Sequence, residues 1–455
     1  MSTKMEGIFQ RSLFATIASI TVFVPEECKY RVLSECLPWP KLADVANNFR
    51  AKKVDINNGA PLNLRLHLGA YIAQTMNGWT DRFTEDQIRY HAGVRILCGI
   101  ENSTETIDHT SLEYFRNCLG KEGAEELNKI IVLHANQKGF TGSGIAASDT
   151  TVQEAPIAFP TEVGHLKNIG EKLLGIGNRI RKGLSQSLGG LAAKARDLFN
   201  EIRLFTKGKK EKILKRKKEL GLKLHRTIGS MYRRVKGAIS GMTSNAGEAY
   251  GENMELFKKM LSQIKIWIKT GFHPSGKIIS LWHQTARAIT RDKAAKATEF
   301  GRRWIITRLT NGYVLGRPCE KLGGDADVGI AEEALIQFLD TFGMVPESFI
   351  YDRGGDGPKN HAILANMGIK NNAIFRKGDG KMDVTKKVFN MAKRERALTE
   401  ASIATLKSGK YGFNKPRAKS EEGCILKGQA AILGSNLNKF FLDTISKRKM
   451  RLEIG

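Results

Sequence analysis

The sequence is poor in the residues that hold metal-bound or disulfide-linked folds together. Its six cysteines are scattered, and none lies in a Cys-x-x-Cys pair. The usual zinc-site spacings are therefore absent, and a disulfide framework is not expected in a chain of 455 residues. The nine histidines are equally dispersed. A reducing, intracellular setting is the simpler inference.

Long apolar runs are also lacking. One run near the start, Leu13 to Val24, is about half the length that a membrane-spanning helix needs, and Ser and Thr interrupt it. It lacks the basic leader and the small-residue cleavage site of a signal peptide. We therefore expect this run to form part of a buried element in a soluble protein with no membrane partner.

Acidic residues are few relative to basic ones. The chain has 73 Lys and Arg against 46 Asp and Glu, a net charge of +27 and a pI near 9.8. Because each neutralised phosphate releases counterions, such an excess favours a nucleic-acid partner. The alternatives are an ordinary basic protein or one that meets acidic membrane surfaces. The apolar fraction of 41% allows real cores, and the length indicates two or three domains.

Residues 1–140 are predicted to form a helical N-terminal domain. Apolar spacing predicts helices over residues 84–99, from Asp108 through Leu119, and over residues 124–134. Asp108 is expected to cap the second of these helices by accepting from its first free amides. Short helices in series are typical of domains that bind DNA, although a dimerisation or packing module has the same pattern. We expect DNA binding here.

Residues 166–298 are predicted to form a basic helical insertion. Within residues 171–240 there are 20 Lys or Arg and only five Asp or Glu. Apolar residues at intervals of three and four from Leu220 to Met242 predict one long helix that packs by a single face. The cations on its other faces form either a solvated surface or a phosphate contact, and their density favours phosphate. The candidate DNA-binding residues are Lys209, Lys210, Lys215, Arg216, Lys217 and Lys218.

Residues 141–165 and 299–440 are predicted to form an α/β core that the insertion interrupts. Small residues after Gly142 predict a strand with Asp149 near its end. Asn311-Gly312 between apolar runs predicts a β-hairpin. The predicted elements that follow are a helix (330–342), a strand (348–351) ending in Asp352, a helix (about 360–367), a strand (373–375) and a long helix (387–407) containing Glu400.

Asp149, Asp352 and Glu400 are the candidate catalytic and metal-binding residues. An acid at the carboxyl end of a strand projects into a crevice at the sheet edge. Carboxylates gathered there repel one another unless cations neutralise them, and Mg²⁺ suits such oxygen ligands. Each acid also has a structural alternative: a turn cap for Asp149, a tight loop for Asp352, and an ion pair with Arg396 for Glu400.

The order and surroundings of these acids resemble the DDE transposases of bacterial insertion sequences, which have a ribonuclease-H-like catalytic core. The similar stretches are Ser148–Ile157 with Phe159–Glu162; Tyr351–Gly355 with Asn360 and Gly368; and Glu400 with Ile403, Leu406-Lys407, Tyr411-Gly412-Phe413 and Arg417. Residues 279–301 and 108–119 also resemble one branch of the family, so that the resemblance spans about residues 80–440.

The second of these similar stretches, Tyr351–Gly355, departs from the family pattern. Gly355 stands where many relatives carry an aromatic residue, and Asp356 lies close by. Asp352 is preferred to Asp356 because it ends the predicted strand. Asp325 and Asp327 are further candidates, in a glycine-rich loop with no strand leading to them.

The resemblance implies a DNA transposase that works in two steps. Water attacks a phosphodiester at the element's end and frees a 3′-hydroxyl, which then attacks target DNA. Asp149 and Asp352 would hold two Mg²⁺ ions, for which Mn²⁺ can substitute, and Glu400 would complete the site for one. Two such ions activate the attacking oxygen and stabilise the leaving one.

The resemblance also implies partners and a location. Lys407, on the same helix face as Glu400, and Arg417 are further candidates for DNA contact. A synapse of two double-stranded DNA ends makes a homodimer the expectation, and a bacterial source implies the cytoplasm, at the nucleoid when DNA is bound. The alternatives are a nuclease or resolvase that cuts without joining, and a catalytically silent DNA-binding protein.

Overall fold

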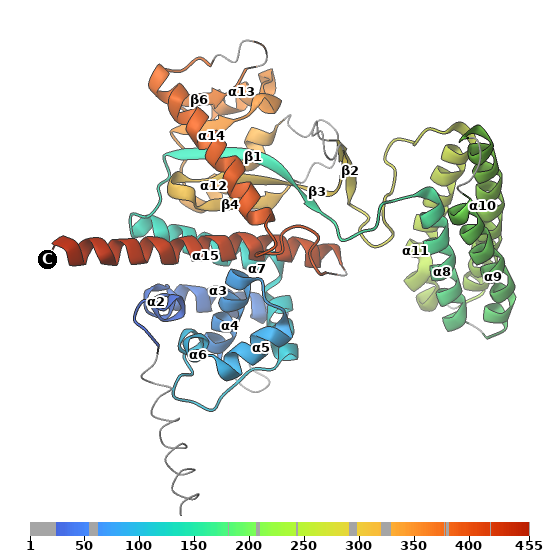
Figure 1. Cartoon of the computed structure of the whole chain (residues 1–455), viewed down its shortest axis with the longest axis horizontal. Helices are drawn as coiled ribbons and strands as arrows, with labels where there is room; N and C mark the ends of the chain where they lie inside the picture. Colours follow the sequence, from blue (N-terminus) through green and yellow to red (C-terminus); the bar gives the residue numbers. More distant parts are fainter. Residues whose placement is uncertain are drawn as a thin grey trace, which may run out of the picture. The chain divides into compact units, whose positions relative to one another are not determined.

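A computed structural model gives the architecture (Figure 1). The described residues are 24–53, 62–180, 182–205, 210–242, 244–290, 298–319, 329–376, 378, 382–418 and 420–454. The apolar run predicted at Leu13 to Val24 therefore lies outside them, except for Val24, which is buried. The chain divides into two compact units, residues 1–156 with 302–455, and residues 157–301.

The first unit begins with six described helices. They are α2 (Lys29–Cys36), α3 (Trp39–Ala51), α4 (Leu64–Asn77), α5 (Asp81–Tyr90), α6 (Ala92–Cys98) and α7 (His109–Gln137). The helix α4 is buried along nearly its whole length, from Leu66 to Met76, so the other helices pack around it. Its apolar side chains belong to the same core cluster as those of the sheet described below.

Two of the predicted N-terminal helices have different limits in the structure. The helix predicted over residues 84–99 is two helices, because His91 adopts an extended backbone (φ −107°, ψ 107°) and its side chain caps α6. The helices predicted on either side of Gly120 are one element, α7, with a kink where Gly120 takes a φ of 64°. Asp108 caps α7 as predicted and accepts hydrogen bonds from the amides of Thr110 and Ser111.

The sheet of this structure is mixed. Its strands are β1 (Ile145–Glu154), β2 (Arg287–Thr290), β3 (Thr298–Arg308), β4 (Val314–Pro318), β5 (Ser348–Tyr351) and β6 (Asn371–Ile374), in the order β2-β3-β1-β5-β6 with β4 also paired to β3. β1, β5 and β6 run parallel, whereas β4 and β2 are antiparallel to β3. The predicted hairpin is confirmed, with the 3₁₀ turn Thr310–Gly312 between β3 and β4.

Helices cover both faces of the parallel strands. They are α12 (Ile330–Phe342), α13 (Pro358–Asn366), α14 (Lys386–Lys407) and α15 (Glu421–Ile454). On one face Ala146 and Phe349 join the core shared with the N-terminal helices. On the other face Ala147 and Ile350 pack with Ala392 of α14, which crosses β1, β5 and β6 (Figure 1). The prediction of a mixed α/β fold is confirmed.

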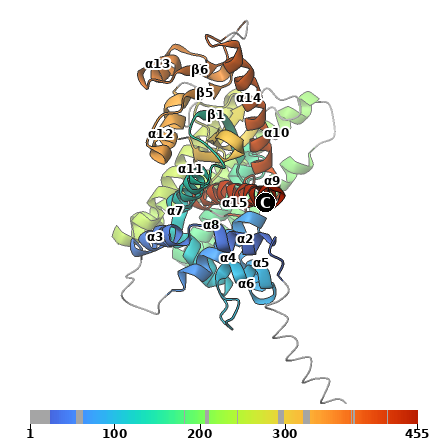
Figure 2. The same cartoon turned by 90° about the vertical axis from the view of Figure 1, so that its left-hand side faces the viewer.

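The long helix α15 runs between the sheet and the N-terminal helices, and both views agree on this position (Figure 2). It packs on α4, α7 and β4. Buried residues such as Ala431, Ile432 and Leu437 line it on several sides. This helix therefore joins the two halves of the first unit into one body.

The second unit contains α8 (Glu162–Ile180), α9 (Lys182–Leu204), α10 (Lys210–Ser240) and α11 (Ser244–Thr270), followed by an irregular segment and β2. Its core is separate and apolar. The predicted stripe on α10 is buried at Leu220, Leu224, Ile228, Met231 and Val235. The stripe ends earlier than predicted, because α10 stops at Ser240 and Met242 follows it. No helix in the described part of the chain is long and apolar enough to cross a membrane.

Candidate active site at the ends of the parallel strands

Asp149 lies on β1, and Asp352 directly follows the neighbouring parallel strand β5. The register pairs Ile145 with Ser348 and Ala147 with Ile350. Continued for two residues, this register places Asp149 opposite Asp352. Neighbouring strands lie about 4.8 Å apart, so the two backbones are within reach of a shared cation.

The two aspartates also share a face of the sheet. Side chains alternate between faces along a strand, so a residue faces the same way as the residue two positions earlier. Ala147 and Ile350 face α14, and the backbone of Asp352 remains extended. Both acids therefore project on the α14 face. The prediction that Asp149 lies near the end of its strand is wrong: β1 continues to Glu154, and it is the neighbouring strand β5 that ends beside Asp149.

A tight loop holds Asp352. Its carboxylate caps the short 3₁₀ turn Arg353–Gly355 and accepts a hydrogen bond from the amide of Gly354 (2.9 Å). Gly355 is buried against Tyr351, whose ring lies 2.4 Å from the position that a Cβ would occupy. This contact explains why no larger side chain stands at position 355 in this chain.

Asp356 supports the loop from the other side. His361 Nε2 lies 2.8 Å from its Oδ1, and His361 Nδ1 lies 2.7 Å from the amide nitrogen of Asn372. Because the amide nitrogen donates, Nδ1 accepts and Nε2 carries the proton that is donated to Asp356. Asp356 is thus hydrogen-bonded to α13, whereas Asp352 faces α14.

Glu400 lies on α14, as predicted. Its carboxylate is 59% exposed and forms an ion pair with Arg396 (3.5 Å), which is the structural alternative that the sequence suggested. One residue earlier, the buried Thr399 hydroxyl is shared between the carbonyl oxygens of Glu395 in α14 (2.8 Å) and Ala147 in β1 (3.4 Å). Glu395 forms a buried ion pair with Arg308 at the end of β3. These contacts fix α14 on the face of the sheet that carries the two aspartates.

An open groove of about 430 Å³, here called the acid-side groove, connects the loop of Asp352 with Glu400. It is lined by Arg353, Phe375, Phe389, Lys393, Arg396, Ala397 and Glu400. Arg396 lies over the ring of Phe375 (5.3 Å from its centroid). The sequence analysis missed Arg353, Lys393, Phe375 and Phe389. For two of them, proximity to the acids in the sequence was the available signal: Arg353 follows Asp352, and Lys393 lies two helical turns before Glu400.

The donor set of the candidate acids suits some metal ions and not others. Within the described ranges, no three His, Cys, Asp or Glu side chains lie close enough to form a metal site. Mg²⁺, however, is usually held by one or two carboxylates together with waters and substrate phosphates. Asp149 and Asp352 supply two carboxylates on one face of the sheet. This donor set fits Mg²⁺, whereas Glu400 is turned toward Arg396.

The candidate DNA-binding cations of the insertion lie at the start of α10. Lys210, Lys215 and Lys218 are exposed. Arg216 instead forms ion pairs with Glu201 (2.8 Å) and Glu219 (3.6 Å), and the Glu201 hydrogen bond raises the pKa of the Arg216 guanidinium. Lys217 is half-buried.

The other candidates have varied surroundings. Lys407 is half-buried in the last turn of α14, and Arg417 is exposed in the loop after it. The neighbouring Leu406, Tyr411 and Phe413 are core residues that pack with Trp304. Lys209, Asp325 and Asp327 lie outside the described residues.

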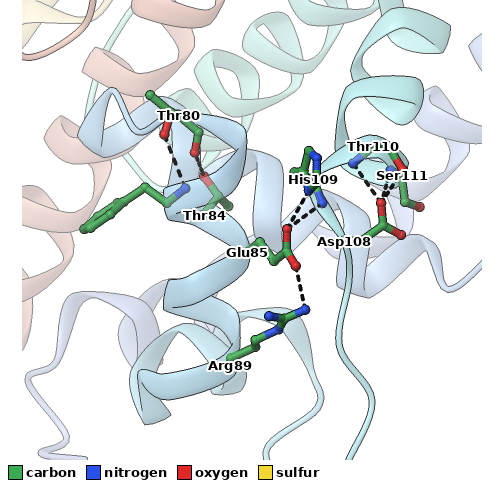
Figure 3. Close-up of polar contacts among 9 residues, drawn as sticks. Thr80, Thr84, Glu85, Arg89, Asp108, His109, Thr110 and Ser111 are labelled. Carbon is green, nitrogen blue, oxygen red and sulfur yellow. Dashed lines mark hydrogen bonds and ion pairs between the residues drawn. The ribbon is translucent and has the colours of Figure 1, made fainter.

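A second polar cluster lies among the N-terminal helices (Figure 3). Glu85 of α5 accepts hydrogen bonds from the backbone amide (3.0 Å) and the ring (2.8 Å) of His109, the first residue of α7. It also accepts from Arg89 (2.5 Å). The bonds from His109 lower the pKa of the Glu85 carboxyl. Together with the caps made by Thr80 and Asp108, this cluster ties α5 to the start of α7.

Comparison with known protein families gives one match. Residues 18–118 match a family described as a transposase domain (DUF772). No curated protein and no solved structure matches the chain. The match covers the N-terminal helices and their polar cluster, and it supports a transposase and hence a DNA-processing protein.

Proposed function

We propose that this protein is a DNA transposase of the DDE type, whose Asp149, Asp352 and Glu400 form the catalytic site of a ribonuclease-H-like core. The observation that carries the proposal is the strand register, which brings Asp149 beside Asp352 on the face covered by α14. The mixed sheet and the position of Glu400 on that helix support the same core. The transposase-domain match supports the class of activity.

The acids hold the metal, and the cations hold the DNA. Asp149 and Asp352 would bind Mg²⁺, and Glu400 would join them by turning away from Arg396. The ions, when bound, activate the attacking oxygen and stabilise the leaving one. Arg353, Lys393 and Arg396 line the acid-side groove and attract the phosphate to be cleaved.

The proposed reaction has two steps. In the first, water forms a bond to phosphorus at the end of the element, the bond to the 3′ oxygen breaks, and that oxygen leaves as a 3′-hydroxyl. In the second, the same hydroxyl attacks a phosphodiester of target DNA, and a 3′ oxygen of the target leaves. Because only the attacking group changes, one set of acids serves both parts.

The distribution of charge favours DNA-backbone binding mainly by the second unit. Residues 157–301 contain 30 Lys and Arg against 11 Asp and Glu, whereas residues 1–140 contain 16 of each. Phosphate contact needs excess cations. We therefore assign it to exposed cations such as Lys210 and Lys215. Residues 1–140 would then act in reading element ends without a large electrostatic contribution, and a homodimer would hold two ends together.

The test is magnesium-dependent cleavage and joining of the element's end DNA by wild type, Asp352→Asn and the matched control Asp356→Asn. We expect Asp352→Asn to lose both reactions while binding DNA as wild type does. Asp356→Asn, which alters the bond to His361, should keep substantial activity. Full activity of Asp352→Asn would refute the site.

A catalytically silent DNA-binding protein is the second candidate. It is favoured by one observation, the ion pair of Glu400 with Arg396, which leaves Glu400 outside a three-acid cluster. Tight DNA binding without any magnesium-dependent product, for wild type as for Asp352→Asn, would establish it. Cleavage without joined products would instead indicate the nuclease or resolvase.

A further inference from the structure

A second groove lies in the first unit, where the last turns of α15 pass the end of α7 and the β3–β4 turn. Here called the terminal groove, it has a volume of about 430 Å³. Three cations, Lys138, Lys447 and Arg451, line it together with Phe140, Asn311 and Asp443. None of these residues belongs to the acid-side groove or to the basic insertion.

The charge of the terminal groove is positive. Asp443 is the one acid among its described lining residues, and it is already engaged. It accepts hydrogen bonds from the hydroxyl of Tyr313 (3.0 Å) and from Asn311 (3.3 Å), and it pairs with Lys439 (2.5 Å). Burial, and then the charge of Asp443, raise the pKa of Tyr313, so this hydroxyl stays a donor. In the described part of the chain, no carboxylate pairs with Lys138, Lys447 or Arg451.

Lys447 is held in place before any partner binds. Lys447 donates a hydrogen bond to the carbonyl oxygen of Lys138 (3.0 Å) and lies over the ring of Phe140 (5.4 Å from its centroid). Arg451 follows Lys447 by one helical turn, which separates them by about 6 Å along the axis of α15. Two successive steps of one DNA strand span about 7 Å along the duplex axis.

We propose that the terminal groove binds the sugar-phosphate backbone of duplex DNA, as a contact separate from the insertion. The identification of the polyanion as DNA rests on the proposed function. Two cations whose axial spacing is close to that of phosphates two steps apart on one strand, with Lys138 on the facing element, match a regular chain of single charges. An acidic peptide is the competing partner, for which Phe140 and Met450 offer apolar contact, but the groove has no exposed strand edge for such a peptide to extend among the described residues that line it.

The experiment measures DNA binding by the full-length protein across a range of salt concentrations, using fluorescence anisotropy of a labelled duplex. The double variant Lys447→Gln/Arg451→Gln is compared with Lys449→Gln. Lys449 is equally exposed on the same helix but does not line the groove. The logarithm of the association constant falls linearly with the logarithm of the salt concentration, and each lost phosphate contact reduces the steepness of this slope by about 0.9. We expect the slope to fall by about two for the double variant and to stay at the wild-type value for Lys449→Gln.

Two results would overturn the proposal. In one, each charge removed changes the slope by the same amount in the double variant and in the Lys449→Gln control. This result would indicate a diffuse effect of net charge. In the other, the double variant binds DNA normally but loses affinity for poly-glutamate, which would indicate an acidic protein partner. Thermal unfolding of both variants checks that loss of the Phe140 contact has not altered the fold. The assay needs no DNA cleavage, so a failure of the proposed chemistry leaves its result interpretable.

Discussion

The hydroxyl of Thr399 on α14 lies 3.4 Å from the carbonyl oxygen of Ala147 on β1 and 2.8 Å from that of Glu395 in its own helix, so its one proton is shared between the two acceptors. Thr399 precedes Glu400, and Ala147 is two residues before Asp149. The bond therefore joins the helix that carries one candidate acid to the strand that carries another. Because Thr399 is buried, water does not replace this contact.

The variant Thr399→Val tests whether the Thr399 hydroxyl positions Glu400 for cleavage, apart from its effect on stability. The change keeps the shape and the β-branch but removes the hydroxyl, so we expect a loss of about 1–2 kcal/mol in the free energy of unfolding. The kcat of DNA cleavage should fall while KM for DNA stays constant. The matched control is Thr405→Val, an exposed residue whose hydroxyl bonds only within α14, to Ala401. Equal kcat values for the two variants would remove any positioning role from Thr399.

Gly355→Ala should disturb the loop of Asp352 by steric overlap alone. A Cβ there would lie 2.4 Å from the ring of Tyr351. Overpacking of this kind costs about 1–3 kcal/mol, and the displaced loop should also lower cleavage activity. Gly357→Ala is the control, because nothing lies within 4 Å of its Cβ position. We expect it to remain within about 0.5 kcal/mol of wild type in urea unfolding. Similar losses at both positions would show that backbone freedom, and not the Tyr351 contact, requires glycine.

The second unit should lose stability as the pH falls below neutrality. His165 is 5% exposed, and burial, with the nearby charge of Lys277, lowers its pKa to about 4. The unfolded chain, with an ordinary histidine pKa near 6.5, binds more protons between these values. The free energy of unfolding is therefore unaffected by the protonation of His165 above about pH 6.5. It decreases as the pH falls toward 4, by about 3 kcal/mol in total.

Urea unfolding at pH 7, 5.5 and 4.5 tests this dependence, with His165→Leu as the comparison. Leucine has no titrating group, so the difference in unfolding free energy between wild type and variant should shrink or reverse as the pH falls. A difference that is the same at every pH would mean that His165 has the same pKa in the folded and the unfolded chain, and would contradict the prediction.

The exposed cations of α10 should control the salt dependence of DNA binding. Lys210→Gln/Lys215→Gln removes two cations that are exposed, and it should lower the salt slope by about two. Arg216→Gln, at the next position on the same helix, should have a much smaller effect, because Arg216 is already paired with Glu201 and Glu219. The measurement is the same anisotropy titration. A larger effect from Arg216 than from the two lysines would reverse this assignment.

The elements that the sequence predicted best are those with a strong local cause. The spacing from Leu220 to Val235 can bury only one face of a helix, and α10 forms accordingly. Asp108 satisfies the free amides at the start of α7 whatever surrounds it. Asn311 takes a φ of 60°, which few residues adopt, and the hairpin turn follows.

Features that depend on distant residues could not be predicted in this way. The break at His91 interrupts an otherwise helical apolar pattern, and nothing local to residues 84–99 requires it. The acid-side groove needs Phe375 after β6 to meet Phe389 of α14, which depends on the strand order. The run of small residues after Gly142 likewise predicted that Asp149 lies on a strand. It could not predict that the neighbouring strand β5 would end beside it.

The pairing of Asp149 with Asp352 depends on hydrogen bonds between two short strands and not on the length of chain between them. All of residues 157–301 lie between the two aspartates in the sequence, yet the register is set by residues 145–147 and 348–350. Homologous chains could therefore gain or lose whole segments in the intervening loops and keep this pair intact. A slip of a single residue within β5, in contrast, would turn Asp352 to the opposite face of the sheet. Length variation among relatives should accordingly be wide between these strands and absent within them.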